Sequence, residues 1–110
     1  MIMEKLGWYK FAKKHVDPVD QIQNTYPGRY DGKLGQFVMS NKKLLFVEEK
    51  GWISKISSLL LEVPYEKVGE ITVKGDRITF TAEDITHSIT SSAASIIESI
   101  LKDLIESYTP

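Results

Sequence analysis

Between residues 19 and 90 the apolar positions recur in short runs, and most of these runs end at turn-forming residues. Short runs in which apolar and polar residues alternate are typical of β-strands with one buried face. The pattern predicts seven strands, at residues 22–26, 33–40, 43–49, 59–63, 71–73, 77–81 and 85–90. Asn41-Lys42 and Gly75-Asp76 would form hairpin turns. Pro27-Gly28 would end the first strand, and Pro64 would stop the fourth because proline has no N–H to donate.

The two ends of the chain follow a helical pattern instead. Ile2, Leu6 and Tyr9 recur at helical spacing, which predicts an amphipathic helix over residues 2–14. A second helix is predicted over residues 91–108, with Ser91 or Ser92 as its N-cap. Its apolar stripe consists of Ala93, Ile97, Ile100, Leu101, Leu104 and Tyr108. Seven short strands followed by such a helix are typical of a small barrel or curved sheet whose open end the helix covers.

Composition narrows the class of protein. The 110 residues suffice for one domain, and 42% hydrophobic with 26% charged residues is an ordinary globular composition. The absence of cysteine excludes disulfides, thiol catalysis and zinc sites built on thiolates. Charges interrupt the first fifteen residues, unlike a signal peptide, and no apolar run is long enough to span a bilayer. We therefore expect a cytoplasmic protein.

Residues 35–46, with the sequence GQFVMSNKKLLF, resemble the signature hairpin of pleckstrin-homology-like (PH-like) domains. Bacterial and archaeal PH domains and GRAM domains usually have glycine, an apolar strand, Thr-Asn-x-Arg, and then Leu-apolar-Phe. Here Ser40 replaces the threonine and Lys43 the arginine, which keeps a polar turn with a cation. Residues 61–68, LEVPYEKV, are similar to the next landmark of that family, an apolar strand followed by proline and a short bend.

The resemblance implies a mainly β fold, a seven-stranded antiparallel barrel or bent sandwich capped by the C-terminal helix. It covers a PH-like domain at residues 19–110 and leaves residues 1–18 as an amphipathic extension. PH-like domains are binding modules for phosphoinositides, peptides or protein domains, and the matching motifs are structural. Lipid-binding members carry clustered cations between their first two strands. The corresponding residues 27–35 offer only Arg29 and Lys33, with Asp31 between them, so these two are weak candidates for an anion contact.

The N-terminal segment has the only concentration of basic residues, although the whole chain has a net charge of −1. Lys10, Lys13 and Lys14 are interleaved with Trp8 and Phe11. An interfacial helix would present these aromatics to the acyl boundary of a membrane and the lysines to anionic head groups. In the other interpretation the aromatics pack on the barrel, and the lysines are solvated. The segment is therefore a candidate contact for a membrane or a partner.

A second candidate partner contact is Trp52 with Ile53, which follows the turn at Lys50-Gly51. A barrel that closes incompletely keeps exposed strand edges, which can pair with another chain. Trp52 and Ile53 would be an apolar contact on that surface. In the alternative interpretation, Trp52 covers the open end of the barrel. Residues 54–58 are expected to be a loop or a short continuation of the chain before the fourth strand.

Other chemistry is weakly indicated. The glycines of residues 28–35 have the wrong spacing for a phosphate-binding loop. His15, Asp17 and Asp20 are close in sequence and could supply metal ligands, and His87 could complete the set only if folding brought it near. His87 alternates with Ile85 and Ile89 as a core residue would. The serines near residue 91 lack a nucleophile-elbow context. We therefore expect no enzyme, no cofactor or metal site and no nucleic-acid binding, but a module that binds a protein partner or itself.

Overall fold

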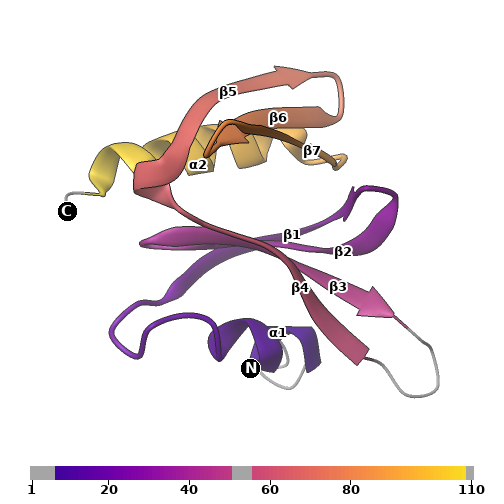
Figure 1. Cartoon of the computed structure of the whole chain (residues 1–110), viewed down its shortest axis with the longest axis vertical. Helices are drawn as coiled ribbons and strands as arrows, with labels where there is room; N and C mark the ends of the chain where they lie inside the picture. The colour runs from indigo at the N-terminus through magenta and orange to yellow at the C-terminus, as the bar shows by residue number, and fades with distance from the viewer. Residues whose placement is uncertain (1–6, 51–55, 109–110) are drawn as a thin grey trace.

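The computed structural model describes residues 7–50 and 56–108 (Figure 1). Helix α1 (Gly7–Lys13) precedes the strands, and helix α2 (Ala94–Ser107) ends the described chain. The strands are β1 (Ile22–Tyr30), β2 (Lys33–Ser40), β3 (Lys43–Lys50), β4 (Ile56–Pro64), β5 (Val68–Lys74), β6 (Arg77–Ala82) and β7 (Ile85–Thr90). A 3-10 helix, η2 (Tyr65–Lys67), joins β4 to β5.

All seven strands belong to one antiparallel sheet with the order β4-β3-β2-β1-β7-β6-β5. Figure 1 shows the sheet bent into two layers, β5–β7 with α2 above and β1–β4 with α1 below. The layers are joined where Arg29 and Tyr30 of β1 pair with Thr90 and Ile89 of β7. This arrangement confirms the expected mainly β fold, a bent seven-stranded sandwich with a C-terminal helix and a short N-terminal helix.

Two glycines that face each other across β1 and β2 permit the close approach of neighbouring strands. Gly28 pairs with Gly35. A Cβ atom on Gly28 would lie 2.7 Å from the carbonyl oxygen of Thr90, and one on Gly35 would collide with the carbonyl oxygen of Val47. Because both obstacles are backbone atoms, a side chain at either position would force a strand to move. Gly28 therefore permits the close approach of β7 to β1, and Gly35 permits that of β3 to β2.

The main hydrophobic core lies between the two layers and against α2. It contains fully buried residues from both layers and from the helix: Phe37, Met39, Leu44, Phe46, Tyr65, Ile78, Phe80, Ile89, Ile97 and Leu101. The other members of the predicted stripe on α2, Ala93, Ile100, Leu104 and Tyr108, are partly buried against this core. The stripe thus has the role expected from its spacing.

A second core lies on the opposite face of β1–β4, beneath α1. Trp8 and Ala12 of α1 are buried against Val38, Leu45 and Val47. The outer face of this layer is apolar at these positions, and α1 removes it from water. Residues 7–13 are therefore packed as part of the domain.

A β-bulge in β1 lets this one strand contribute to both cores. The β1–β2 register shifts between Ile22 and Asn24. The extra residue reverses the alternation of side chains, so Ile22 packs in the outer core with α1 while Tyr26 and Tyr30 pack on the main core.

Some element boundaries differ from those expected. Strand β1 continues through Pro27 and Gly28 to Tyr30, because Pro27 lies where β1 has no strand partner on its β7 side and an N–H is not needed. Strand β4 begins at Ile56, inside the expected loop. Helix α2 begins at Ala94, later than expected, and its N-cap Ala93 makes no side-chain cap. The predicted cap Ser91 accepts the Ala93 N–H through Oγ at 3.1 Å, just before the helix, and its hydroxyl also donates to the Pro27 carbonyl, 2.8 Å away.

Candidate functional site

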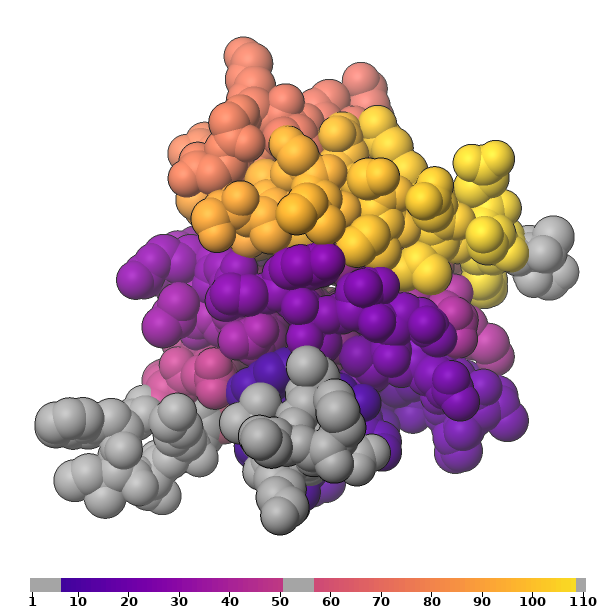
Figure 2. Space-filling model, turned by 180° about the vertical axis from the view of Figure 1, so that it is seen from behind, coloured from indigo at the N-terminus to yellow at the C-terminus, as the bar shows by residue number. Residues whose placement is uncertain are grey.

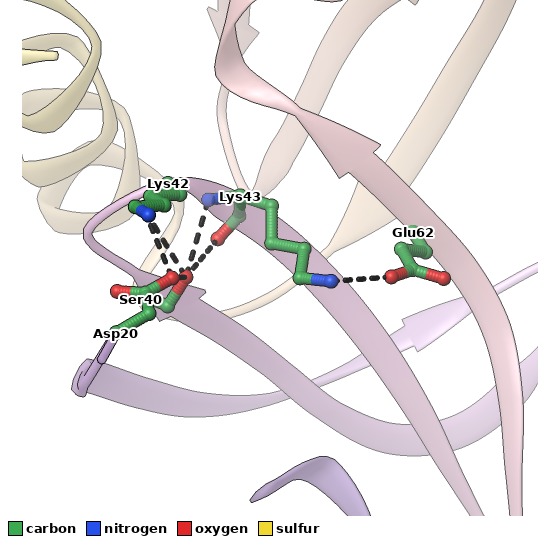
Figure 3. A network of polar contacts seen from close by, with 5 residues as sticks. All are labelled: Asp20, Ser40, Lys42, Lys43 and Glu62. Atoms are coloured by element: carbon green, nitrogen blue, oxygen red, sulfur yellow. Dashed lines mark hydrogen bonds and ion pairs between the residues drawn. The ribbon is translucent and has the colours of Figure 1, made fainter. Parts of the chain in front are cut away.

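A buried carboxylate organises the β2–β3 turn that carries the family resemblance (Figure 3). Asp20 is 7% exposed. Its Oδ2 accepts a hydrogen bond from Ser40 Oγ at 2.6 Å and one from the Lys42 N–H at 3.3 Å. Its Oδ1 accepts from the N–H groups of Gln21 at 2.7 Å and Asn41 at 2.9 Å. The carboxylate is therefore engaged by donors that hold the turn.

Tyr65 and Lys43 extend this network to β4 and η2. The Tyr65 hydroxyl donates to the Ser40 carbonyl. Burial, and secondarily the charge of Asp20, raises the pKa of Tyr65 well above its usual range. Lys43 Nζ lies 2.6 Å from Glu62 Oε2 on the neighbouring strand, with the lysine side chain 19% exposed. The motif residues Ser40 and Lys43 thus hold strands together.

Asp20 and His87, two of the candidate metal ligands, form hydrogen bonds with other side chains of the fold. Within residues 7–50 and 56–108, no group of three histidine, cysteine, aspartate or glutamate side chains is arranged to hold a metal ion. His87 lies on β7, half-buried, with its Nδ1 2.9 Å from the Tyr30 hydroxyl and its ring 5.3 Å from that of Phe80. Burial, and secondarily Asp31, raises the pKa of Tyr30.

The aromatic residues of α1 are more buried than its basic residues, and Tyr9 lies next to Lys13, whose Nζ is 5.9 Å from the centre of its ring. Trp8 is 6% exposed and packs on the sheet, and Phe11 is half-buried with its ring 4.9 Å from that of His15. Lys10, Lys13 and Lys14 are exposed. Because Trp8 is occupied in the outer core, a membrane or partner that met this surface would meet the lysines first.

A groove runs from the end of α1 along β1. Its larger part has a volume of about 400 Å³ and is lined by Tyr9, Lys13, Val16, Asp17, Pro18, Asp20, Gln21 and Ile22. A second part of about 240 Å³ shares Tyr9 and Ile22 and continues along residues 23–26. We call the two parts together the α1–β1 groove. Seen from behind, the surface of β1 and β2 forms a purple band between α2 above and α1 below (Figure 2).

The strand that borders this groove has an open edge. On its β7 side, β1 is paired only through Arg29 and Tyr30. In the described part of the chain, no strand pairs with residues 22–26 on that side. Pro27 lies between the paired and the open parts, and its carbonyl accepts the Ser91 hydroxyl. The sequence predicts an exposed strand edge but did not indicate that it would be this part of β1, because that depends on how far β7 runs beside β1.

The remaining candidates are placed as follows. Arg29 and Lys33 are exposed beside the β1–β2 turn, where Arg29 Nη1 donates to the Gly32 carbonyl at 3.2 Å. Asp31 and Gly32 form this turn with φ values of 53° and 77°, as a type I′ turn requires. Trp52 and Ile53 lie outside the described residues.

Comparison with known proteins adds no identity. No protein-family model matches the chain, and no curated protein matches it. In the described residues, no helix is both long enough and apolar enough to cross a membrane.

Proposed function

We propose that this chain is a non-catalytic, PH-like binding module of the cytoplasm whose ligand is a protein, either a partner or a second copy. The observation that carries the proposal is the open edge of β1 at residues 22–26 beside the α1–β1 groove. Unpaired strand N–H and C=O groups are complemented best by another polypeptide backbone. The resemblance of residues 35–46 and 61–68 to PH-like domains supports the same class of function.

The polar groups of the interior support a binding role over a catalytic one. Asp20, Ser40 and Tyr65 bond to one another or to the backbone of the β2–β3 turn. Tyr30 and His87 bond to each other between the two layers. Each of these groups has a structural partner, so their chemistry is accounted for by the fold.

The test combines light scattering with capture of protein partners. The proposal expects either a mass well above 12.5 kDa that rises with concentration, or a captured protein that rebinds the pure chain with a measurable affinity. A small molecule that stabilises the chain against heat and is chemically converted by it would overturn the proposal. The proposal would also be overturned if the chain is strictly monomeric and no captured protein rebinds to it.

A second candidate function is peripheral association with an anionic membrane surface. The observation in its favour is that Lys10, Lys13 and Lys14 are exposed on or just after α1, a helix without an acidic residue. Each lysine near such a surface contributes about 1 kcal/mol. Membrane association predicts pelleting with anionic but not neutral vesicles, loss of pelleting at high salt, and loss when the three lysines become glutamine. Pelleting that is insensitive to these substitutions would contradict it.

A further inference from the structure

We propose that the α1–β1 groove binds an extended acidic segment of another protein, which adds to the sheet as a strand beside β1. This inference rests on the proposed function and specifies its partner. It joins two features of the groove, the open backbone of β1 and the lysines of α1.

The backbone geometry identifies which groups of β1 are available. The two-residue turn at Asp31-Gly32 makes Tyr30 and Lys33 a hydrogen-bonded pair, so the N–H and C=O of Arg29 point away from β2 and toward β7. Backbone groups of alternate residues point to the same edge. Thr25 therefore directs its N–H and C=O to the open side, as Arg29 directs its own to β7.

Pro27 limits where an added strand can bind. It occupies the same edge as Arg29 and Thr25 but has no N–H, and its carbonyl is engaged by Ser91. An incoming strand can therefore pair with residues 22–26 only. The paired segment of the partner would therefore span no more than these five residues of β1.

The charges around the groove select an acidic partner. Lys13 lines the groove, and Lys10 and Lys14 are exposed on the same helical segment. The carboxylate of Asp20 is buried and held by its own donors, which leaves Asp17 as the exposed acid of the lining. Because α1 has no acidic residue, the exposed charges of α1, Lys14 and the groove lining taken together are three lysines and one aspartate.

The same charges disfavour a second copy of this chain as the occupant. Antiparallel pairing of two β1 strands about a two-fold axis perpendicular to the sheet places both α1 helices on one face of the joined sheet. The lysine-bearing helices would then lie on the same side of the shared seam, where their like charges repel. A separate acidic chain meets no such repulsion.

The test uses peptides selected by the folded chain from a display library of random twelve-residue peptides. We expect the selected peptides to be rich in aspartate, glutamate and β-branched residues, and to bind in a fluorescence anisotropy assay. Thr25→Pro removes only the outward N–H, and proline is tolerated at such an edge position, so this variant should bind at least tenfold more weakly. Thr25→Val keeps the N–H and is the matched comparison, so the loss in Thr25→Pro is measured against the affinity of this variant. Lys13→Glu should weaken binding several-fold.

A second measurement leaves the protein unaltered, in case Thr25→Pro fails to fold. The selected peptide is N-methylated at alternate residues in two sets. The peptide that is methylated at the N–H groups facing β1 should not bind, whereas the peptide that is methylated at the other N–H groups should bind. Equal binding of both sets, equal affinity of the Thr25→Pro and Thr25→Val variants, or selected peptides without acidic residues would overturn the inference.

The failure of this inference can be distinguished from failure of the proposed function. If a captured protein or a second copy binds the pure chain but Thr25→Pro leaves its affinity unchanged, the groove proposal is wrong and the binding function stands. If no peptide and no protein binds, both are wrong. If no peptide is selected and anionic vesicles bind the chain, the inference is wrong and the lysines of α1 face a membrane.

Discussion

Replacing Asp20 by alanine tests whether its carboxylate organises the β2–β3 turn. The carboxylate accepts four hydrogen bonds, and a bond to a charged group contributes about 1.5–3 kcal/mol to stability. Simple addition would predict a loss of roughly 6–12 kcal/mol, enough to unfold a domain whose total stability is about 5–15 kcal/mol.

The structure predicts a much smaller loss, because three of the donors have a second acceptor nearby. Ser40 Oγ lies 3.1 Å from the Lys43 carbonyl, the Asn41 N–H lies 3.2 Å from the Gln21 carbonyl, and the Lys42 N–H lies 3.3 Å from Ser40 Oγ. These bonds remain when the carboxylate is removed. We therefore expect Asp20→Ala to lower the free energy of unfolding by about 2–3 kcal/mol, the contribution of one or two charge-assisted bonds.

Urea denaturation followed by circular dichroism measures this change, with the slope of the transition unchanged. Asp20→Asn keeps one acceptor oxygen and should cost about 1 kcal/mol. Asp17→Ala removes an exposed carboxylate and is the control, expected within about 0.5 kcal/mol of the unmodified chain. A loss above about 6 kcal/mol for Asp20→Ala would refute the argument from second acceptors, and one below about 0.5 kcal/mol would show that the carboxylate does not hold the turn.

Three further predictions concern packing and pH. Gly35→Ala should destabilise the chain by about 3 kcal/mol or more in the same denaturation assay, because its Cβ meets strand backbone. Gly7→Ala, with nothing within 4 Å, should cost nothing, and equal effects would contradict this account. Trp8→Ala should cost about 3–5 kcal/mol if α1 is part of the domain, whereas a loss below 1 kcal/mol would mean that α1 does not stabilise it. Folding raises the pKa of the Tyr65 hydroxyl, so the folded state keeps this proton at a pH where the unfolded state, with a pKa of about 10, loses it. The contribution of Tyr65 to the free energy of unfolding is therefore present in full below about pH 10 and falls as the pH rises above it. Unfolding measured from about pH 8 to 11.5 should show a steeper fall in stability for the unmodified chain than for Tyr65→Phe. Parallel curves would refute the assignment.

Features governed by local patterns could be predicted from the sequence. The Asn41-Lys42 hairpin and the Gly75-Asp76 turn lie where the sequence indicated, since each depends on a few neighbouring residues. The apolar stripe of α2 likewise follows from helical periodicity alone. The overall architecture followed from the number and order of these elements together with the resemblance of residues 35–46 to PH-like domains.

Features that depend on contacts between distant residues could not be predicted in this way. The sequence pattern makes Asp20 a candidate metal ligand, but the fold places it against Ser40 and the β2–β3 turn, twenty residues further along the chain. Ser91 Oγ accepts the Ala93 N–H next to α2, as the sequence predicts for a cap, but the local pattern does not show that the same hydroxyl donates to the Pro27 carbonyl. In each case a local pattern showed a polar side chain without showing which partner the fold would bring to it.

The candidate binding site depends most strongly on tertiary structure. The sequence by itself determined that residues 7–14 combine aromatics with lysines and that residues 22–26 form a strand. Only the tertiary structure decided that Trp8 turns inward, that the lysines remain in solvent, and that β7 leaves the edge of β1 open. The physical reason is that side-chain periodicity is set by neighbours along the chain, whereas the pairing of a strand edge is set by where another strand ends in space.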